Sequence, residues 1–237
     1  MPSGLVLEAF PEAGLAPTPD MADAPAAPLR RGVALSSAEP KVLLAVLRPE
    51  ANLAVWDRGP PYGISAASLA LLLAAAPFTA ASGDDFPRAA VAALARQLPA
   101  PAPLDLLLDV RDLAEVFAGI ASDNGRIRLR LEAVTRRGCH RWHADAVGLR
   151  LLCTYRGPGT EWLGLAGGAE AARALGPAVR PPGRPARFPM GSAAILKGEA
   201  HPGNAGWGCV HRSPPAGPHP RARLLLCIDQ PGRFSSE

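Results

Sequence analysis

The 237-residue sequence has few aromatic residues, few cysteines and no long hydrophobic run. Aromatic residues make up 5% of the chain, so there is no series of stacking side chains of the kind that binds single-stranded nucleic acid. The four cysteines form no Cys-x-x-Cys pair and are too sparse for a disulfide scaffold, which favours reduced thiols and a cytoplasmic location. The most apolar run, Leu69 to Ala76, is well short of the ~20 residues that a bilayer needs, and the N-terminus lacks the pattern of a signal peptide.

The rest of the composition is typical of a folded protein, since apolar residues make up 48% and charged residues 19% of the chain. The 24 glycines and 27 prolines follow no regular period and indicate many turns, which argues against a long helical bundle. The net charge of +4 permits an anionic partner but does not form the concentrated basic stripe of nucleic-acid-binding domains. Nucleic acid is therefore not favoured as a partner.

The order of patterns along the chain predicts three segments. Residues 1–35 are rich in alanine and proline and are predicted to form a flexible arm. Residues 36–125 are predicted to form a helical extension, with helices over residues 65–76, from about residue 85 and, most clearly, over residues 106–120. In this last helix the apolar residues recur at intervals of four and three and share one stripe: Leu106, Val110, Leu113, Phe117 and Ile120.

The remaining segment, residues 126–237, is predicted to be rich in strands. Between residues 126 and 133, apolar and charged residues alternate, as expected of a strand with one buried face. Short apolar stretches bounded by glycine and proline follow, interrupted by one possible helix over residues 169–176. The sequence therefore predicts an α+β protein with a C-terminal β-sandwich or barrel, and with the preceding helices packed against its outside.

Two histidines and one aspartate could bind a metal ion. In the His-Ala-Asp sequence at residues 143–145, His143 and Asp145 share one face of an extended backbone. His211 follows 68 residues later in another short β segment. Two imidazoles and one carboxylate form the facial triad of non-haem Fe(II) oxygenases, which leaves coordination positions open. Arg221 and Arg223 lie shortly after His211, where a guanidinium can pair with a carboxylate.

Other interpretations of these residues remain open. Cys139 and Cys209 could join the two histidines in a tetrahedral zinc site, or they could be small buried hydrophobic residues. The histidines, the aspartate and the arginines could also make ordinary structural contacts. Tyr155 precedes the turn Gly157-Pro158-Gly159, and we expect it either at the rim of the site, near the cofactor, or in a purely structural turn.

The order of this motif, HxD followed by histidine and then arginine, resembles that of the Fe(II)- and 2-oxoglutarate-dependent dioxygenases. The resemblance implies a cupin-like double-stranded β-helix over residues 126–237, with iron bound by the two histidines and the aspartate. It further implies that Arg223 or, failing that, Arg221 holds a carboxylate of 2-oxoglutarate. The expected activity is hydroxylation of a small-molecule or protein substrate that the sequence does not identify.

In several short stretches the sequence also resembles the bacterial family called domain of unknown function 1826. It is carried by five stretches: His143–Asp145, Arg150–Trp162, Leu196–Glu199, Val210–Pro215 and Arg223–Leu226. Members of this family resemble, in genomic context, proteins found beside zinc-responsive metallochaperone GTPases, which implies a link to metal handling. The alternative function is therefore a non-catalytic or zinc-binding protein of metal homeostasis, and a structural module with a degenerate site is a third.

Overall fold

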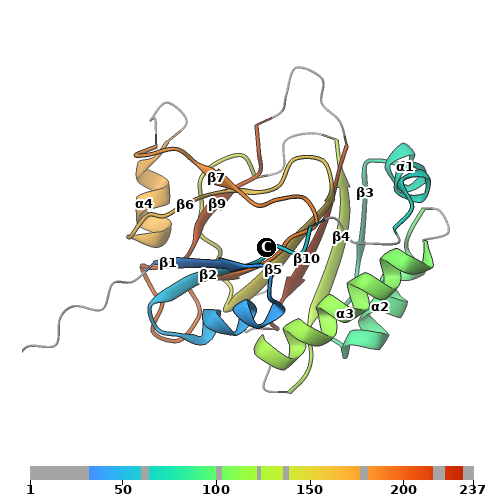
Figure 1. Ribbon diagram of the computed structural model, residues 1–237, viewed down its shortest axis with the longest axis horizontal. Helices are drawn as coiled ribbons and strands as arrows, with labels where there is room; N and C mark the ends of the chain where they lie inside the picture. Colours follow the sequence, from blue (N-terminus) through green and yellow to red (C-terminus); the bar gives the residue numbers. More distant parts are fainter. Residues whose placement is uncertain are drawn as a thin grey trace, which may run out of the picture.

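The computed structural model describes residues 32–59, 64–99, 103–121, 124–135, 139–176, 181–215 and 222–231. Most of the arm expected over residues 1–35 lies outside the described residues, and so does Arg221. The described part is a mixed α+β structure with one large sheet, one small sheet and helices on the outer faces of both (Figure 1). No helix in these residues combines the length and apolarity needed to cross a bilayer.

Seven strands form the large sheet. Their bounds are β1 (Val33–Ser37), β2 (Ala51–Trp56), β3 (Phe78–Ala81), β4 (Arg128–Val134), β5 (Leu149–Arg156), β8 (Ala193–Lys197) and β10 (Arg223–Asp229). They lie in the order β1-β2-β8-β5-β10-β4-β3. β1 and β2 are parallel and the other neighbours are antiparallel. β4 alternates between buried and half-buried residues, which confirms the predicted period of two.

The small sheet consists of β6 (Glu161–Leu163), β7 (Ala186–Arg187) and β9 (Val210–Arg212), in the order β7-β6-β9. His143 forms an isolated antiparallel bridge with His211, so the HxD segment lies alongside β9. From β4 onward the chain passes repeatedly between the two sheets. A cluster of buried apolar side chains lies between the two sheets, with Trp162 of β6 packed against it. Its members come from the large sheet and from residues next to β7 and β9: Leu53, Val55, Leu152, Phe188, Ala194, Leu196, Cys209 and Cys227.

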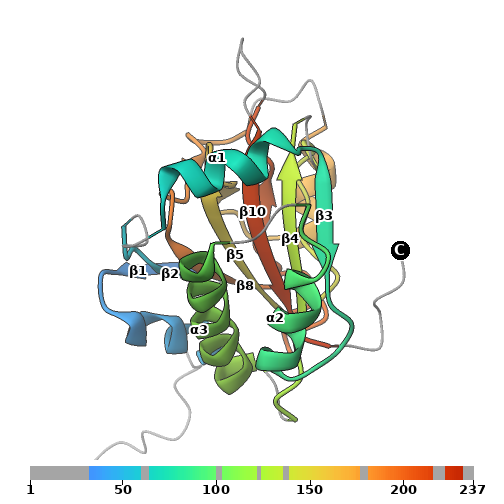
Figure 2. The same cartoon turned by 90° about the vertical axis from the view of Figure 1, so that its right-hand side faces the viewer.

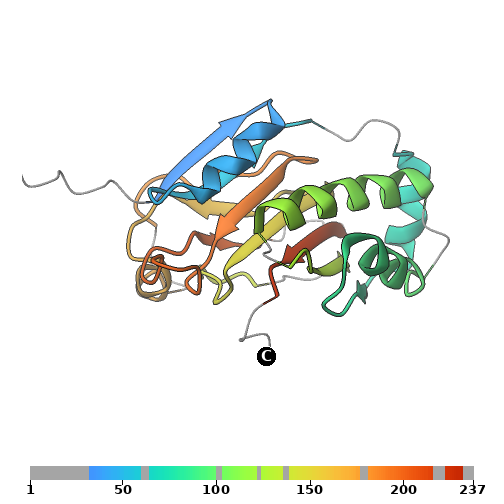
Figure 3. The same ribbon diagram turned by 90° about the horizontal axis from the view of Figure 1, so that it is seen from below.

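Helices cover the outer face of each sheet. The 3-10 helix η2 (Pro40–Leu47) and the helices α1 (Ala66–Ala74), α2 (Pro87–Ala95) and α3 (Leu104–Ala121) share one core with the large sheet, and α4 (Gly168–Ala174) packs on the small sheet. Figure 2 shows α1, α2 and α3 in front of β4, β5 and β10, and Figure 3 shows η2 in blue beside β1 and β2. Along α3, Leu106, Val110, Leu113 and Phe117 are buried, so the predicted apolar stripe is confirmed.

The expectation of a helical extension over residues 36–125 is incomplete, because β2 and β3 come from this part of the chain and extend the large sheet. β2 is buried on both faces and shows no alternation, so no period of two marks it as a strand in the sequence. β3 has only four residues, too few for a period to emerge. One continuous sheet therefore crosses the boundary expected near residue 125.

Candidate metal centre

The structure brings His143, Asp145 and His211 together although they are far apart in sequence. His143 and His211 exchange backbone hydrogen bonds of 3.0 and 2.9 Å, which aligns the HxD segment with β9 and places the two rings with their centroids 4.3 Å apart. Asp145 follows two residues after His143 on the same side. Among the described residues, these three offer ligand atoms that all lie within 4.8 Å of one another.

Both imidazole rings are oriented by backbone carbonyls. His143 Nδ1 lies 2.9 Å from the carbonyl oxygen of Arg141, and His211 Nδ1 lies 3.0 Å from that of Cys209. A carbonyl only accepts hydrogen bonds, so each Nδ1 carries a proton, and the neutral form of either ring keeps its lone pair on Nε2. Nε2 of His143 lies 3.7 Å from Oδ1 of Asp145, and Nε2 of His211 lies 3.3 Å from Oδ2. This tautomer is the one in which a histidine coordinates a metal ion through Nε2.

The carboxylate of Asp145 has one satisfied and one unsatisfied oxygen. Oδ1 is 2.7 Å from Nη1 of Arg150, whereas the buried Oδ2 accepts no hydrogen bond from any described residue. A buried anionic oxygen without a partner is costly, and a neutral imidazole whose proton is on Nδ1 cannot supply a hydrogen bond to it. A divalent cation bound by Oδ2 and the two Nε2 atoms would satisfy all three. The residues present therefore fit a metal ion.

The electrostatics favour the forms that bind metals. Burial, and after it the charge of His211, lowers the pKa of His143 and so favours its neutral form. Burial alone would raise the pKa of Asp145, but the cationic form of His211 and the guanidinium of Arg150 outweigh it and hold this pKa well below its usual range. Near neutral pH the site therefore offers a carboxylate and a neutral imidazole, which compete little with protons for the metal.

The structure does not assemble the rival zinc site. Cys139 Sγ lies 3.5 Å from Nδ1 of His143, on the ring edge remote from Nε2. Cys209 is buried in the apolar cluster between the sheets, and burial raises the pKa of its thiol well above the usual range. Neither thiol belongs to the converging group found among the described residues. Strand alternation predicted that Cys139 shares a face with His143 and that Cys209 shares one with His211. It could not show which atoms of the histidine rings, or which other side chains, each thiol contacts.

Arg223 is a buried cation on the same side of the large sheet as the three candidate ligands. Leu224, Leu226 and Ile228 of β10 belong to the core shared with the helices, so Arg223 faces the small sheet instead. Its Nη2 donates hydrogen bonds to the hydroxyl groups of Thr154 and Thr160 at 3.1 and 2.6 Å, and its buried Nε has no partner among the described residues. Burial lowers the pKa of Arg223 to about 10. A guanidinium in this state favours an anionic ligand.

A family model described as "Protein of unknown function (DUF1826)" matches residues 37–229, most of the chain. The chain belongs to the DUF1826 family. The comparison with curated proteins gave no match.

Solved structures resemble this DUF1826 protein at low sequence identity. AviO1 from Streptomyces viridochromogenes Tue57 aligns with a TM-score of 0.43 and 16% identity over 85% of this chain and 99% of AviO1. The dioxygenase for auxin oxidation 1 from Arabidopsis thaliana, in complex with 2-oxoglutarate, aligns with a TM-score of 0.37 and 15% identity over 68% of this chain and 65% of the dioxygenase. The dioxygenase for auxin oxidation from rice aligns with a TM-score of 0.32 and 16% identity over 72% of this chain and 65% of the rice protein.

The structure does not bring Tyr155 to the candidate site of the DUF1826 protein, which corrects the expectation that it contacts a cofactor. Tyr155 follows Thr154 on β5, so the two side chains point to opposite faces of the large sheet. The Tyr155 hydroxyl donates a 2.6 Å hydrogen bond to Asp109 of α3, which also pairs with Arg58. Strand alternation counted from Arg150 was the signal that could have shown this.

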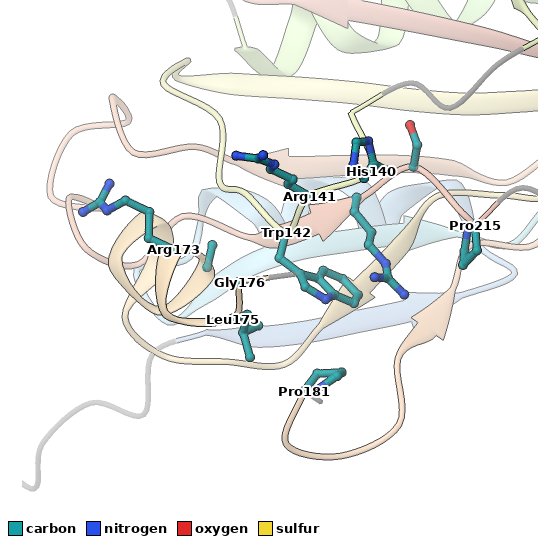
Figure 4. Close-up of a pocket in the computed structure, with 11 residues that line it drawn as sticks. His140, Arg141, Trp142, Arg173, Leu175, Gly176, Pro181 and Pro215 are labelled. Carbon is teal, nitrogen blue, oxygen red and sulfur yellow. The ribbon is translucent and has the colours of Figure 1, made fainter. Parts of the chain in front are cut away.

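A hollow of about 580 Å³ lies on the outer face of the small sheet, beside α4. Its lining includes Trp142, Leu175 and Pro181, as Figure 4 shows, together with Arg212. Arg212 stacks on Trp142 and pairs with the buried Glu161. His211 is the neighbour of Arg212 on β9 and therefore faces the opposite way, toward the interior. This hollow is thus separate from the candidate metal centre.

Proposed function

We propose that this DUF1826 protein is a mononuclear Fe(II)- and 2-oxoglutarate-dependent oxygenase. The observation that carries the proposal is the convergence of two imidazole Nε2 atoms on the carboxylate of Asp145, whose buried Oδ2 has no hydrogen-bond partner among the described residues. His143, Asp145 and His211 would hold the iron on one side and leave the remaining positions open. When bound, iron supplies the redox chemistry with oxygen that hydroxylation requires.

The arrangement of strands supports a double-stranded β-helix for residues 126–237. Passing from β4 through the HxD segment to β10, the chain alternates between the large and the small sheet, and the two sheets enclose an apolar interior. In this interpretation β1, β2 and β3 extend the barrel sheet, and η2 and α1–α3 brace its outside.

Arg223 is the residue that would hold the co-substrate. Its guanidinium is fixed by the uncharged hydroxyl groups of Thr154 and Thr160, and burial outweighs the favourable charge of Glu132 and lowers the pKa of Arg223. One carboxylate of 2-oxoglutarate would accept hydrogen bonds from this group and restore the charge balance. Around it, buried apolar side chains such as Leu152 and Phe188 keep water from the interior. Among the described residues, the burial of Arg223 and its unpartnered Nε favour it for this role. Arg221 lies outside the described residues.

The test is anaerobic reconstitution with Fe(II) followed by measurement of succinate formed from 2-oxoglutarate and oxygen. We expect metal-dependent succinate formation that is lost in His143→Ala and in His211→Ala. His201→Ala is the matched control, because His201 lies in the loop between β8 and β9 and bonds only locally to Pro202. Retention of full activity in both ligand variants would refute the proposal.

A non-catalytic metal-binding protein is the second candidate, because the same three donors also suit zinc. It predicts one tightly bound Zn²⁺ per chain, loss of binding in His143→Ala, and no succinate formation with Fe(II) under any condition. The cysteines would not bind this zinc ion. Cys209 is buried in the apolar cluster between the sheets, and Cys139 lies beside Nδ1 of His143, not beside the ligand atom Nε2.

A further inference from the structure

Arg150 connects Asp145 to a second carboxylate, that of Asp229. Arg150 Nη1 lies 2.7 Å from Asp145 Oδ1. On its other edge, Nε and Nη2 donate to the two oxygens of Asp229 at 2.6 and 2.9 Å. All three side chains are largely buried, with 11–18% of their surface exposed. The two hydrogen bonds to Asp229 therefore fix the orientation of the guanidinium that contacts Asp145.

The strands dictate this arrangement. Arg150 and Asp229 are directly opposite each other in the antiparallel pair formed by β5 and β10, and both face the interior. The two-point contact restricts rotation of the guanidinium, so Nη1 is held toward Asp145. Because two strands of the large sheet carry this pair, the position of Nη1 is as rigid as the sheet itself.

The consequence concerns how Asp145 can bind a metal ion. A carboxylate can coordinate through one oxygen or through both. Here Oδ1 is paired with Arg150 and lies 3.7 Å from Nε2 of His143. Oδ2 accepts no hydrogen bond from a described residue and faces Nε2 of His211 at the shorter distance of 3.3 Å. The group of two carboxylates and one guanidinium carries a net charge of −1, so it still attracts a divalent cation.

We propose that Arg150, braced by Asp229, is a positioning residue that restricts Asp145 to coordination through Oδ2 alone. This inference rests on the proposed function, in that it requires a metal ion at the three ligands. It assigns to Arg150 the task of keeping one coordination position open for an incoming molecule. Without Arg150, Oδ1 would be free to bind the metal as a second oxygen and to displace one water molecule.

The test uses Mn²⁺ bound to the full chain and two readouts other than turnover. Electron paramagnetic resonance of free Mn²⁺ gives the affinity, and the relaxation rate of water protons reports the water molecules on the bound ion. We compare the parent with Arg150→Met, Arg150→Lys and Asp229→Asn. Arg58→Met is the matched control, because Arg58 makes an equally buried two-point contact, with Asp109, on the opposite face of the large sheet.

For Arg150→Met we expect a loss of affinity of about tenfold to a hundredfold, as for other residues that orient metal ligands. We also expect a lower relaxation rate per bound ion, because one water is displaced. Lysine restores the charge without the fork and should recover the relaxation rate only in part. Asp229→Asn keeps the contact between Arg150 and Asp145 but loosens it, so both the affinity and the relaxation rate should lie between those of the parent and Arg150→Met. This variant also tests the proposal if Arg150→Met does not fold. Arg58→Met should lower the melting temperature and leave both metal readouts at the parent value.

The two levels of the proposal fail in different ways. If the parent binds no Mn²⁺ that depends on His143 and His211, the proposed function fails and this inference fails with it. If the parent binds the ion but the Arg150 and Asp229 variants match it in affinity and relaxation rate, only the positioning role is overturned. Equal changes in Arg58→Met would also overturn it, because they would show a general effect of losing a buried ion pair.

Discussion

Replacing Arg223 by methionine separates a ligand-binding role from a structural one, because the two roles predict opposite effects on stability. Burial lowers the pKa of Arg223 from 12.5 to about 10. The charged form is therefore less stable in the folded protein than in water by about 3 kcal/mol, since a tenfold change in acidity corresponds to about 1.4 kcal/mol. This cost is fully present at every pH below about 10 and declines only as the pH rises through that value.

Methionine removes the charge, and with it the cost, but also removes the hydrogen bonds to Thr154 and Thr160. Those bonds are worth about 1–3 kcal/mol together. The free energy of unfolding of Arg223→Met should therefore equal or exceed that of the parent, which is unusual for the loss of a buried side chain with two hydrogen bonds. Chemical denaturation measures this difference directly.

The same variant should lose its response to 2-oxoglutarate. In the Mn²⁺-loaded parent, ligand at a hundred times its Kd adds about 2.7 kcal/mol of stability, which raises the Tm by about 5–10 °C for a chain of this size. Loss of charged hydrogen bonds worth about 1.5–3 kcal/mol weakens binding by roughly 10- to 150-fold, so Arg223→Met should show a much smaller shift at the same concentration. Arg156→Met, at an exposed position near the same end of the sheet, is the control. A destabilised Arg223→Met that keeps the full thermal response would refute this reasoning.

Three further predictions follow from the packing. Tyr155→Phe should lower the free energy of unfolding by about 1.5–3 kcal/mol through loss of the bond to Asp109, with Mn²⁺ affinity unchanged; reduced affinity would contradict its placement away from the site. Phe117→Ala should cost about 3–5 kcal/mol in urea denaturation because this ring is fully buried in the main core, and a cost below about 1 kcal/mol would show that α3 packs differently. Iodoacetamide should alkylate the native protein at the exposed Cys139, as measured by mass spectrometry. Burial raises the pKa of Cys153 to about 11 and that of Cys227 to about 12, so both thiols should be protected. Rapid modification of either buried cysteine would contradict this prediction.

Local periodicity predicted much of the fold, and it failed where an element was too short or too buried to show a period. The stripe of α3 and the alternation of β4 each extend over several residues with one wet face, so both could be recognised in the sequence. β7 has two residues and β2 is buried on both faces, so neither produces such a pattern. The joining of β2 and β3 to the other strands of the large sheet depends on pairings between distant segments, which composition does not encode.

The candidate site shows the same division. The HxD spacing sufficed to place His143 and Asp145 on one side, and a later β segment supplied His211. The contact between Arg150 and Asp145 was not predictable, because it depends on the register of β5 against β10 and on the bend that follows the HxD segment. The turn after Tyr155 permitted a place either at the rim of the site or in a structural role, and the alternation of β5 turns its side chain to the face opposite Thr154.

The most direct test of the central claim is an anomalous-difference map from crystals loaded anaerobically with Fe(II), recorded at the iron absorption edge. The account predicts one peak per chain, about 2.0–2.3 Å from Nε2 of His143, Nε2 of His211 and Oδ2 of Asp145. A peak at Cys139 or Cys209, or no peak between the two imidazoles at saturating iron, would contradict it.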